Sequence, residues 1–256
     1  DSILEQSPNA INVVVSNPMD TRTYQALKAT GLPKNRIIGM GGALDSSRFK
    51  TYLSKALKKP ANDIHGMVIG GHGDTTMIPL TRLASYNGVP VSSFLSSNEL
   101  DQVASDTMVG GATLTKLIGT SAWYAPGASV AYLVDSIVNN QKRMIPCSGY
   151  LEGEYGQSDI CIGVPCIIGR EGLESIGSLD LNISEQDLKI SKGSYLPSNE
   201  GFVFVHRSDK SFQVAREEKN RLLSGARELP VAVAVPTSPL ARGPRAAHVG
   251  HLPELS

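Results

Sequence analysis

The sequence lacks an excess of charge of either sign, because 24 lysines and arginines balance 24 aspartates and glutamates among its 256 residues. This balance gives no electrostatic argument for binding nucleic acid or an anionic membrane surface. No apolar run reaches the roughly 18 to 20 residues that a membrane-spanning helix needs. Since 41% of the residues are hydrophobic and 19% are charged, we expect a globular chain with no nucleic-acid or membrane partner.

Cysteine is also scarce, with only Cys147, Cys161 and Cys166. Their number is odd and their spacing does not match a metal site, so we predict reduced, buried side chains in a cytoplasmic protein. The letters "HGD" could pair His72 with Asp74 at a metal ion, but no second histidine or cysteine follows at usable spacing. The expectation is therefore that the protein holds no metal.

The apolar pattern of the first half predicts an α/β fold. Short β-branched runs that end at glycine or proline predict buried strands, and the first of them, "INVVVSNP", is expected to be parallel. Two stretches with helical periodicity follow strands, "DTRTYQALKATG" and "LDSSRFKTYLSKALKK". The first should end at Gly31, and the second has Asp45 as its candidate N-cap.

The pattern then changes to one typical of an α+β arrangement. Long helices are predicted over 98–119 and 121–141, and Pro126 should kink or begin the second one. Residues 143–177 alternate apolar and polar side chains between glycine turns, which predicts an antiparallel meander. The letters "SEQDLKISKG", residues 184–193, indicate the start of a last helix.

The composition changes near Gly193. Six of the fifteen prolines lie after residue 192, and the closing "PVAVAVPTSPLARGPRAAHVGHLPELS" has no period. Two interpretations stay open: a disordered tail, or residues produced by a frameshift or an error in the gene model. Neither gives this segment a catalytic role.

Three polar positions lie at the ends of predicted strands or the starts of predicted helices, where α/β proteins bind ligands. Asn17 belongs either to an ordinary Asn-Pro turn or to a site where its amide bonds a ligand oxygen. Asp45 and Arg48 are three residues apart, so their side chains share one helical face. They are either a cap with a surface arginine, or a carboxylate that orients a base beside a guanidinium that grips a substrate carboxylate.

The third position is His72, set between glycines in "VIGGHGDTTMIPL". A lone loop histidine is usually structural or solvated, and His65 has that interpretation. The glycines beside His72 leave room for a substrate to approach, and a carboxylate partner would fix its tautomer and raise its pKa. His72 is therefore the candidate proton carrier.

Five blocks of the sequence carry a resemblance to a known family. They are "VVVSNPMD", "IIGMGGALDSSRF", "GGHGDTTMIPL", "SAWYAPGAS" and "CSGYLEGEYGQSDICIGVPCIIG". In order and spacing, from about Asn9 to Leu188, the chain resembles the malate dehydrogenases of the lactate dehydrogenase-like type. The "LDSSRF" and "GGHGD" blocks are the most specific. The implied fold is the end of a dinucleotide-binding parallel sheet followed by the family's C-terminal substrate domain.

The resemblance implies a role for each matching residue. His72 would be the proton donor and acceptor at the substrate hydroxyl, Asp45 would pair with it, and Arg48 would bind the substrate carboxylate. The other implied contacts are those of Asn17 with the substrate oxygen, of the backbone of Val15, Ser16 and Asn17 with the nicotinamide and its ribose, and of Ser121 and Ala122 with the substrate pocket.

The implied function is the NAD-dependent oxidation of malate to oxaloacetate, with NAD as the hydride acceptor and His72 as the proton acceptor. The implied partners are a small dicarboxylic 2-hydroxy or 2-oxo acid and further copies of the chain in a homo-oligomer. Two alternatives stay open. One is a lactate or other 2-hydroxy acid dehydrogenase, and the other is a non-catalytic remnant that binds small acids or mediates oligomerisation.

The sequence departs from the family in its phosphate-binding loop. No G-x-G-x-x-G occurs, and "GMGGAL" comes nearest. The family's arginine loop, which distinguishes malate from lactate, has no match either. We therefore expect a fragment with little activity by itself. Its expected parts are 1–20, the last part of an NAD-binding Rossmann domain, 21–192, the catalytic domain, and 193–256, the atypical tail.

Overall fold

A computed structural model describes residues 2–181, 196–198, 201–203 and 232–235. The main elements in chain order are α1 (Ser2–Gln6), β1 (Ile11–Val14), α2 (Met19–Thr30), β2 (Ile37–Gly39), α3 (Gly41–Leu57), β3 (Ile64–His65), β4 (Val68–Gly70), β5 (Met77–Pro79), β6 (Ser85–Tyr86), β7 (Val89–Pro90), α4 (Ser97–Ile118), α5 (Tyr124–Val138), β8 (Arg143–Glu152), β9 (Ser158–Gly169), β10 (Gly172–Ile176), β11 (Leu196–Ser198), β12 (Gly201–Val203) and β13 (Ala232–Val235). This alternation of helices and strands confirms the α/β prediction.

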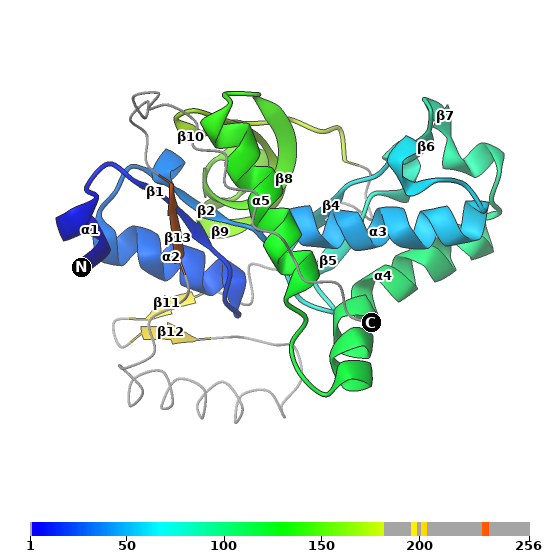
Figure 1. Cartoon of the computed structure of the whole chain (residues 1–256), viewed down its shortest axis with the longest axis horizontal. Helices are drawn as coiled ribbons and strands as arrows, with labels where there is room; N and C mark the ends of the chain where they lie inside the picture. The colour runs from blue at the N-terminus through cyan, green and yellow to red at the C-terminus, as the bar shows by residue number, and fades with distance from the viewer. Residues whose placement is uncertain (1, 182–195, 199–200, 204–231, 236–256) are drawn as a thin grey trace, which may run out of the picture.

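One large sheet organises the molecule (Figure 1). Its strand order is β13-β1-β2-β8-β9-β4-β5, with β10 paired to β9. The buried strand β1 pairs with β2 in parallel, as its β-branched sequence predicted. The strands β8, β9 and β10 form the antiparallel meander predicted over 143–177. Because β2 also pairs with β8, the parallel part and the meander form one continuous sheet.

The helix α3 lies between two hydrophobic clusters. On one side, Ala43 and Leu44 belong to the larger core with the β8 and β9 side chains. On the other side, Phe49 and Leu53 are fully buried in a second cluster. In Figure 1, α4 runs beside α3. A helix buried on both sides holds its polar side chains in fixed positions, which matters for Asp45 and Arg48.

The start of α3 corrects one prediction. Asp45 does not cap the helix, since α3 begins four residues earlier, at Gly41. The two glycines that should have ended the preceding strand instead form the first helical turn. A side chain at Gly42 would lie 2.8 Å from the Pro146 carbonyl, so glycine lets the helix begin tightly against the sheet. Asp45 thereby falls in the second turn, where it is 2% exposed.

The predictions for Gly31 and Pro126 are confirmed. Gly31 ends α2 with a φ of 63°, in the left-handed region that favours glycine. α5 begins at Tyr124, so Pro126 lies in its first turn, where a missing N–H costs no helical bond. The three cysteines are buried and form no disulfide. Among the described residues, no helix is both long and apolar enough to cross a bilayer.

Most of the segment after Gly193 lies outside the described residues, as does the last helix predicted over 184–193. Three short strands of this segment are described, and β13 pairs antiparallel with β1, a pairing that the sequence pattern did not predict. The division into parts at residues 20 and 192 stays a prediction. The main sheet itself takes strands from all three parts.

Candidate active site

Three of the predicted site residues meet at one carboxylate. His72 Nδ1 lies 2.7 Å from Asp45 Oδ2, and Arg48 donates to Asp45 Oδ1 at 3.3 Å. The Asp45 side chain is 2% exposed, that of His72 11% and that of Arg48 20%. Asp45 therefore faces the imidazole with one oxygen and the guanidinium with the other, away from most of the solvent.

The environment of His72 changes its basicity. Burial by itself lowers the pKa of His72, but the hydrogen bond and the charge of Asp45, together with the charge of Asp20, raise that pKa above its ordinary value. Arg48 acts in the opposite direction. Since Nδ1 faces a carboxylate, the neutral ring carries its proton on Nδ1 and leaves Nε2 as the acceptor. The arrangement can take a proton from a group placed at Nε2.

The glycines around His72 make room for its ring and its loop. A side chain at Gly41, on the first turn of α3, would lie 2.9 Å from the His72 ring. One at Gly71 would lie 2.6 Å from the Thr76 hydroxyl, which closes the loop from the other side. Gly70 has a φ of 86° where β4 ends and the loop begins. The histidine is thus packed tightly between a helix start and a loop.

The remaining predicted residues lie in two loops. Val15, Ser16 and Asn17 follow β1 directly, and the Asn17 carbonyl accepts from Arg22 Nε at 2.7 Å. Ser121 and Ala122 lie in the connection between α4 and α5. Within the described part of the chain, none of these residues hydrogen-bonds to His72, Asp45 or Arg48.

Comparison with known proteins identifies the family of this chain. The sequence model described as "lactate/malate dehydrogenase, alpha/beta C-terminal domain" matches residues 42–194, more than half of the chain.

The chain belongs to the lactate/malate dehydrogenase family.

Relatives of this family are close in sequence. The chain is 77% identical over 188 residues to a malate dehydrogenase from Flavobacterium johnsoniae, which is 73% of this chain and 60% of that protein. It is 70% identical over 186 residues to a malate dehydrogenase from Bacteroides thetaiotaomicron, or 73% and 59% of the two proteins. The chain thus spans about 60% of the length of the curated relatives it matches.

Solved structures of the family share the fold. A malate dehydrogenase from Salinibacter ruber superposes with a TM-score of 0.74 at 35% identity, over 88% of this chain and 68% of that one. A lactate dehydrogenase from Eimeria maxima, solved with NADH and oxamate, gives a TM-score of 0.72 at 32% identity, over 89% and 66% of the chains.

Two residues of the site were missed from the sequence. Asp20, in the first turn of α2, accepts from the main-chain N–H of His72 at 2.8 Å. Gly111, on α4, lies against Arg48, because a side chain there would be 3.0 Å from Arg48 Nη1. The available signals were an acidic residue in the first turn of the helix that follows a strand, and a pair of adjacent glycines inside a helix.

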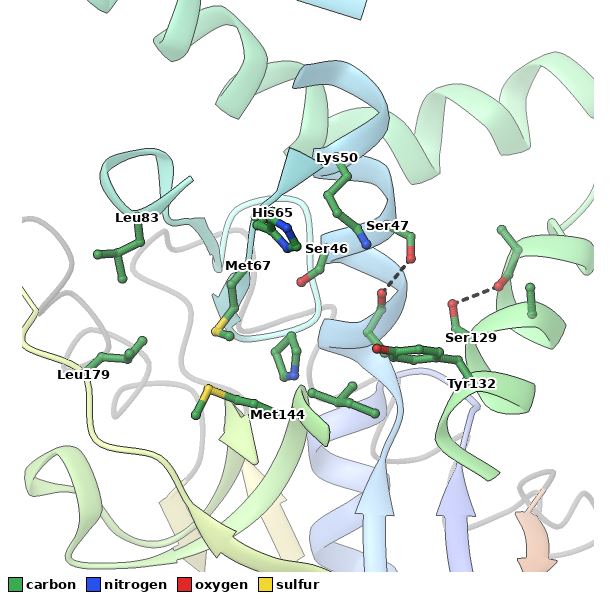
Figure 2. A pocket seen from close by; sticks show the side chains of 16 residues that line it. Ser46, Ser47, Lys50, His65, Met67, Leu83, Ser129, Tyr132, Met144 and Leu179 are labelled. Carbon is green, nitrogen blue, oxygen red and sulfur yellow. Dashed lines mark hydrogen bonds between the residues drawn. The ribbon is translucent and has the colours of Figure 1, made fainter. Parts of the chain in front are cut away.

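A cavity of about 560 Å³ lies between α3, α5 and β8. Its lining includes none of His72, Asp45 and Arg48. Figure 2 shows that the Ser47 and Ser129 hydroxyls on its wall turn back to carbonyls of their own helices, at 3.0 and 2.9 Å. The cavity is therefore lined by residues other than His72, Asp45 and Arg48, and two of its hydroxyls are already engaged in hydrogen bonds.

Proposed function

We propose that this chain carries the proton-transfer and substrate-anchoring residues of an NAD-dependent malate dehydrogenase. The observation that supports the proposal best is the buried contact of 2.7 Å between His72 and Asp45, with Arg48 on the same carboxylate. The contact occurs in a chain that is 77% identical to a malate dehydrogenase over 188 residues. Curated relatives down to 43% identity have the same name.

In the proposed reaction, His72 is the base. Its Nε2 takes the proton of the malate hydroxyl while the hydride leaves the same carbon. The Asp45 carboxylate keeps the Nδ1 proton in place and stabilises the imidazolium that forms. Arg48 anchors a substrate carboxylate by charge-assisted hydrogen bonds, which fixes the direction of the reacting carbon.

The end of β1 suits a nicotinamide cofactor. In α/β sheets, ligands bind beyond the carboxyl ends of parallel strands, and Val15, Ser16 and Asn17 occupy that position. The Ser16 hydroxyl is buried and has no hydrogen-bond partner among the described residues, so a polar group of a ligand could satisfy it. We assign these three residues to the nicotinamide and its ribose, and Asn17 also to the substrate oxygen. When bound, NAD would accept the hydride.

The residues of the α4–α5 connection complete the proposed site. Ser121 and Ala122 are small and would line the substrate pocket. Two aromatic side chains at the end of this connection are exposed, Trp123 at 71% and Tyr124, the first residue of α5, at 93%. Because such side chains favour burial against a partner, we propose that the protein forms a homo-oligomer. We also propose that it acts in the cytoplasm, on a dicarboxylic acid of central carbon metabolism.

A hybrid enzyme tests the function. The 188 matched residues of this chain would replace the aligned segment of the Flavobacterium johnsoniae protein, and malate-dependent NADH formation would be measured. We expect turnover with malate. The variant His72→Asn should remove it, whereas His65→Asn, at the exposed histidine of β3, should not. A folded hybrid without malate-dependent turnover, or one that keeps its rate in His72→Asn, would refute the proposal.

A further inference from the structure

A second carboxyl group is buried beside His72. Asp20 is 4% exposed, and its Oδ2 accepts from the main-chain N–H of His72 at 2.8 Å. The two residues are 52 positions apart, so this bond ties the start of α2 to the glycine loop. The reaction described above makes no use of Asp20.

The surroundings of Asp20 come from several elements. The Ser148 hydroxyl of β8 lies close enough to lower the pKa of Asp20, yet Asp20 Oδ1 and Ser148 Oγ complete no hydrogen bond of ordinary geometry in the described chain. Cys161 of β9 also faces this carboxyl, and burial raises the pKa of its thiol, so it stays neutral. The charged groups that act on Asp20 are His72 and Asp45.

The charges that face His72 are nearly balanced without Asp20. Asp45 supplies one negative charge and Arg48, on the same carboxylate, one positive charge. The positive charge of Arg48 opposes the protonation of His72, and the negative charge of Asp20 favours it. The negative charge of Asp20 thus offsets the effect of the positive charge of Arg48 on the pKa of His72.

We propose that Asp20 is a positioning residue for His72, which holds the main chain of the histidine loop and supplies a second negative charge for the imidazolium. The proposal deepens the proposed function and rests on it for the role of His72 in turnover. Burial raises the pKa of Asp20, whereas a proton on His72 lowers it. The two groups therefore titrate as a coupled pair: the carboxyl ionises more easily when the imidazole is charged.

A substitution can remove the charge of Asp20 and keep its hydrogen-bond acceptor for the His72 N–H. In Asp20→Asn, an amide oxygen can still accept from the His72 N–H. His72 would be titrated by NMR in the full chain with labelled histidine, its signal identified by its loss in His72→Asn. We expect the midpoint of His72 to fall by roughly half a pH unit or more, because one poorly screened negative charge has gone. The midpoint of His65 should stay unchanged.

A matched control is Asp74→Asn, which removes an exposed carboxylate two residues from His72 in the same loop. It should leave the midpoint of His72 within about 0.2 of the wild-type value, since solvent screens the charge. An unchanged midpoint in Asp20→Asn, or an equal fall in Asp74→Asn, would overturn the proposal.

The wild-type chain provides a second measurement in case Asp20→Asn does not fold. The carboxyl carbon signal of Asp20 should show a step at the midpoint of His72, as coupled groups do. A flat signal across that midpoint would refute the coupling. Neither measurement needs substrate or cofactor. An inactive hybrid together with a coupled Asp20–His72 pair would therefore refute the proposed function and leave this proposal standing.

Discussion

Two aspartates of this chain make hydrogen bonds of similar length in opposite environments. Asp45 is 2% exposed and faces His72 and Arg48. Asp159, at the start of β9, has a side chain that is 50% exposed, and one of its oxygens accepts from Tyr24, Tyr150 and Lys28, each at 2.9 Å. Contact distances alone therefore do not separate the two clusters, since those of Asp45 are 2.7 and 3.3 Å.

The difference between them lies in solvent screening. At the surface, water weakens the attraction between Lys28 and Asp159, and such pairs contribute on the order of 0.2 to 1 kcal/mol. Around Asp45 little water is present, so the same charges change the basicity of the neighbouring histidine. The surface cluster fixes α2 against β8 and β9, whereas the buried cluster raises the pKa of His72.

The largest effect that we expect is a difference in enzymatic rate between variants of the two aspartates. In the hybrid enzyme, Asp45→Asn should lower the rate of hydride transfer about 10²- to 10⁴-fold, because the amide no longer stabilises the imidazolium or fixes the ring tautomer. Asp159→Asn should change it less than about twofold, as expected for an exposed surface pair. Stopped-flow absorbance of NADH measures both, and equal losses would contradict the comparison.

A smaller effect is expected at Gly111, which shapes the buried cluster without any charge. Gly111→Ala adds a methyl group about 3.0 Å from Arg48 Nη1, so the guanidinium must move. We expect KM for malate to rise roughly tenfold with little change in kcat, since carboxylate anchoring is impaired. The unfolding free energy should meanwhile increase by up to about 1 kcal/mol, because alanine favours a helix more than glycine does.

The control for this variant is Gly127→Ala on α5. A side chain at Gly127 would have no neighbour within 4 Å, so the variant should share the gain in helix stability and leave KM unchanged. If Gly111→Ala binds malate as well as the wild type, then the glycine has only a packing role at the α3–α4 contact.

The sequence predicted which local segments carry the site residues, but not which distant residues contact them. The strand end before Asn17, the shared face of Asp45 and Arg48, and the glycine loop of His72 follow from local patterns. The roles came from the family resemblance. The patterns failed where distant segments meet, because periodicity describes one segment at a time. Asp20 therefore seemed an ordinary residue of a helical first turn.

The beginning of α3 shows the same limit. Glycines after a short strand normally predict a turn, and Asp45 then becomes a candidate cap. What decides the structure is the close approach of the Pro146 carbonyl and the His72 ring to Gly42 and Gly41. Such tertiary contacts cannot be derived from spacing, and they turn a predicted cap into a buried carboxylate.

The dependence of stability on pH should have opposite signs in the two clusters. The pKa of His72 is raised in the folded state, so its contribution is full below its ordinary pKa and is lost as pH rises through the folded value. The pKa of Asp159 is lowered, since its hydrogen bonds from Lys28 and the two tyrosines outweigh the raising effect of burial. Its contribution is therefore present above its ordinary pKa and is lost as pH falls through the folded value.

Urea unfolding of the chain checks these signs. The stability difference between wild type and His72→Asn should shrink from pH 6 to pH 9. The difference between wild type and Asp159→Asn should shrink from pH 6 to pH 3. Differences that change with pH in the same direction would show that screening and burial have not separated the clusters as described.

The smallest effect should come from Lys28, whose side chain is 48% exposed. Its ammonium lies 2.9 Å from Asp159 and 4.9 and 5.0 Å from the ring centroids of Tyr24 and Tyr150. We expect Lys28→Met to lower the unfolding free energy by at most about 1 kcal/mol, and 1 M NaCl to remove most of that difference. Tyr24→Phe deletes an uncharged donor, so its cost should persist in salt. A Lys28→Met cost that is larger and indifferent to salt would mean that the surface cluster is as poorly screened as the buried one.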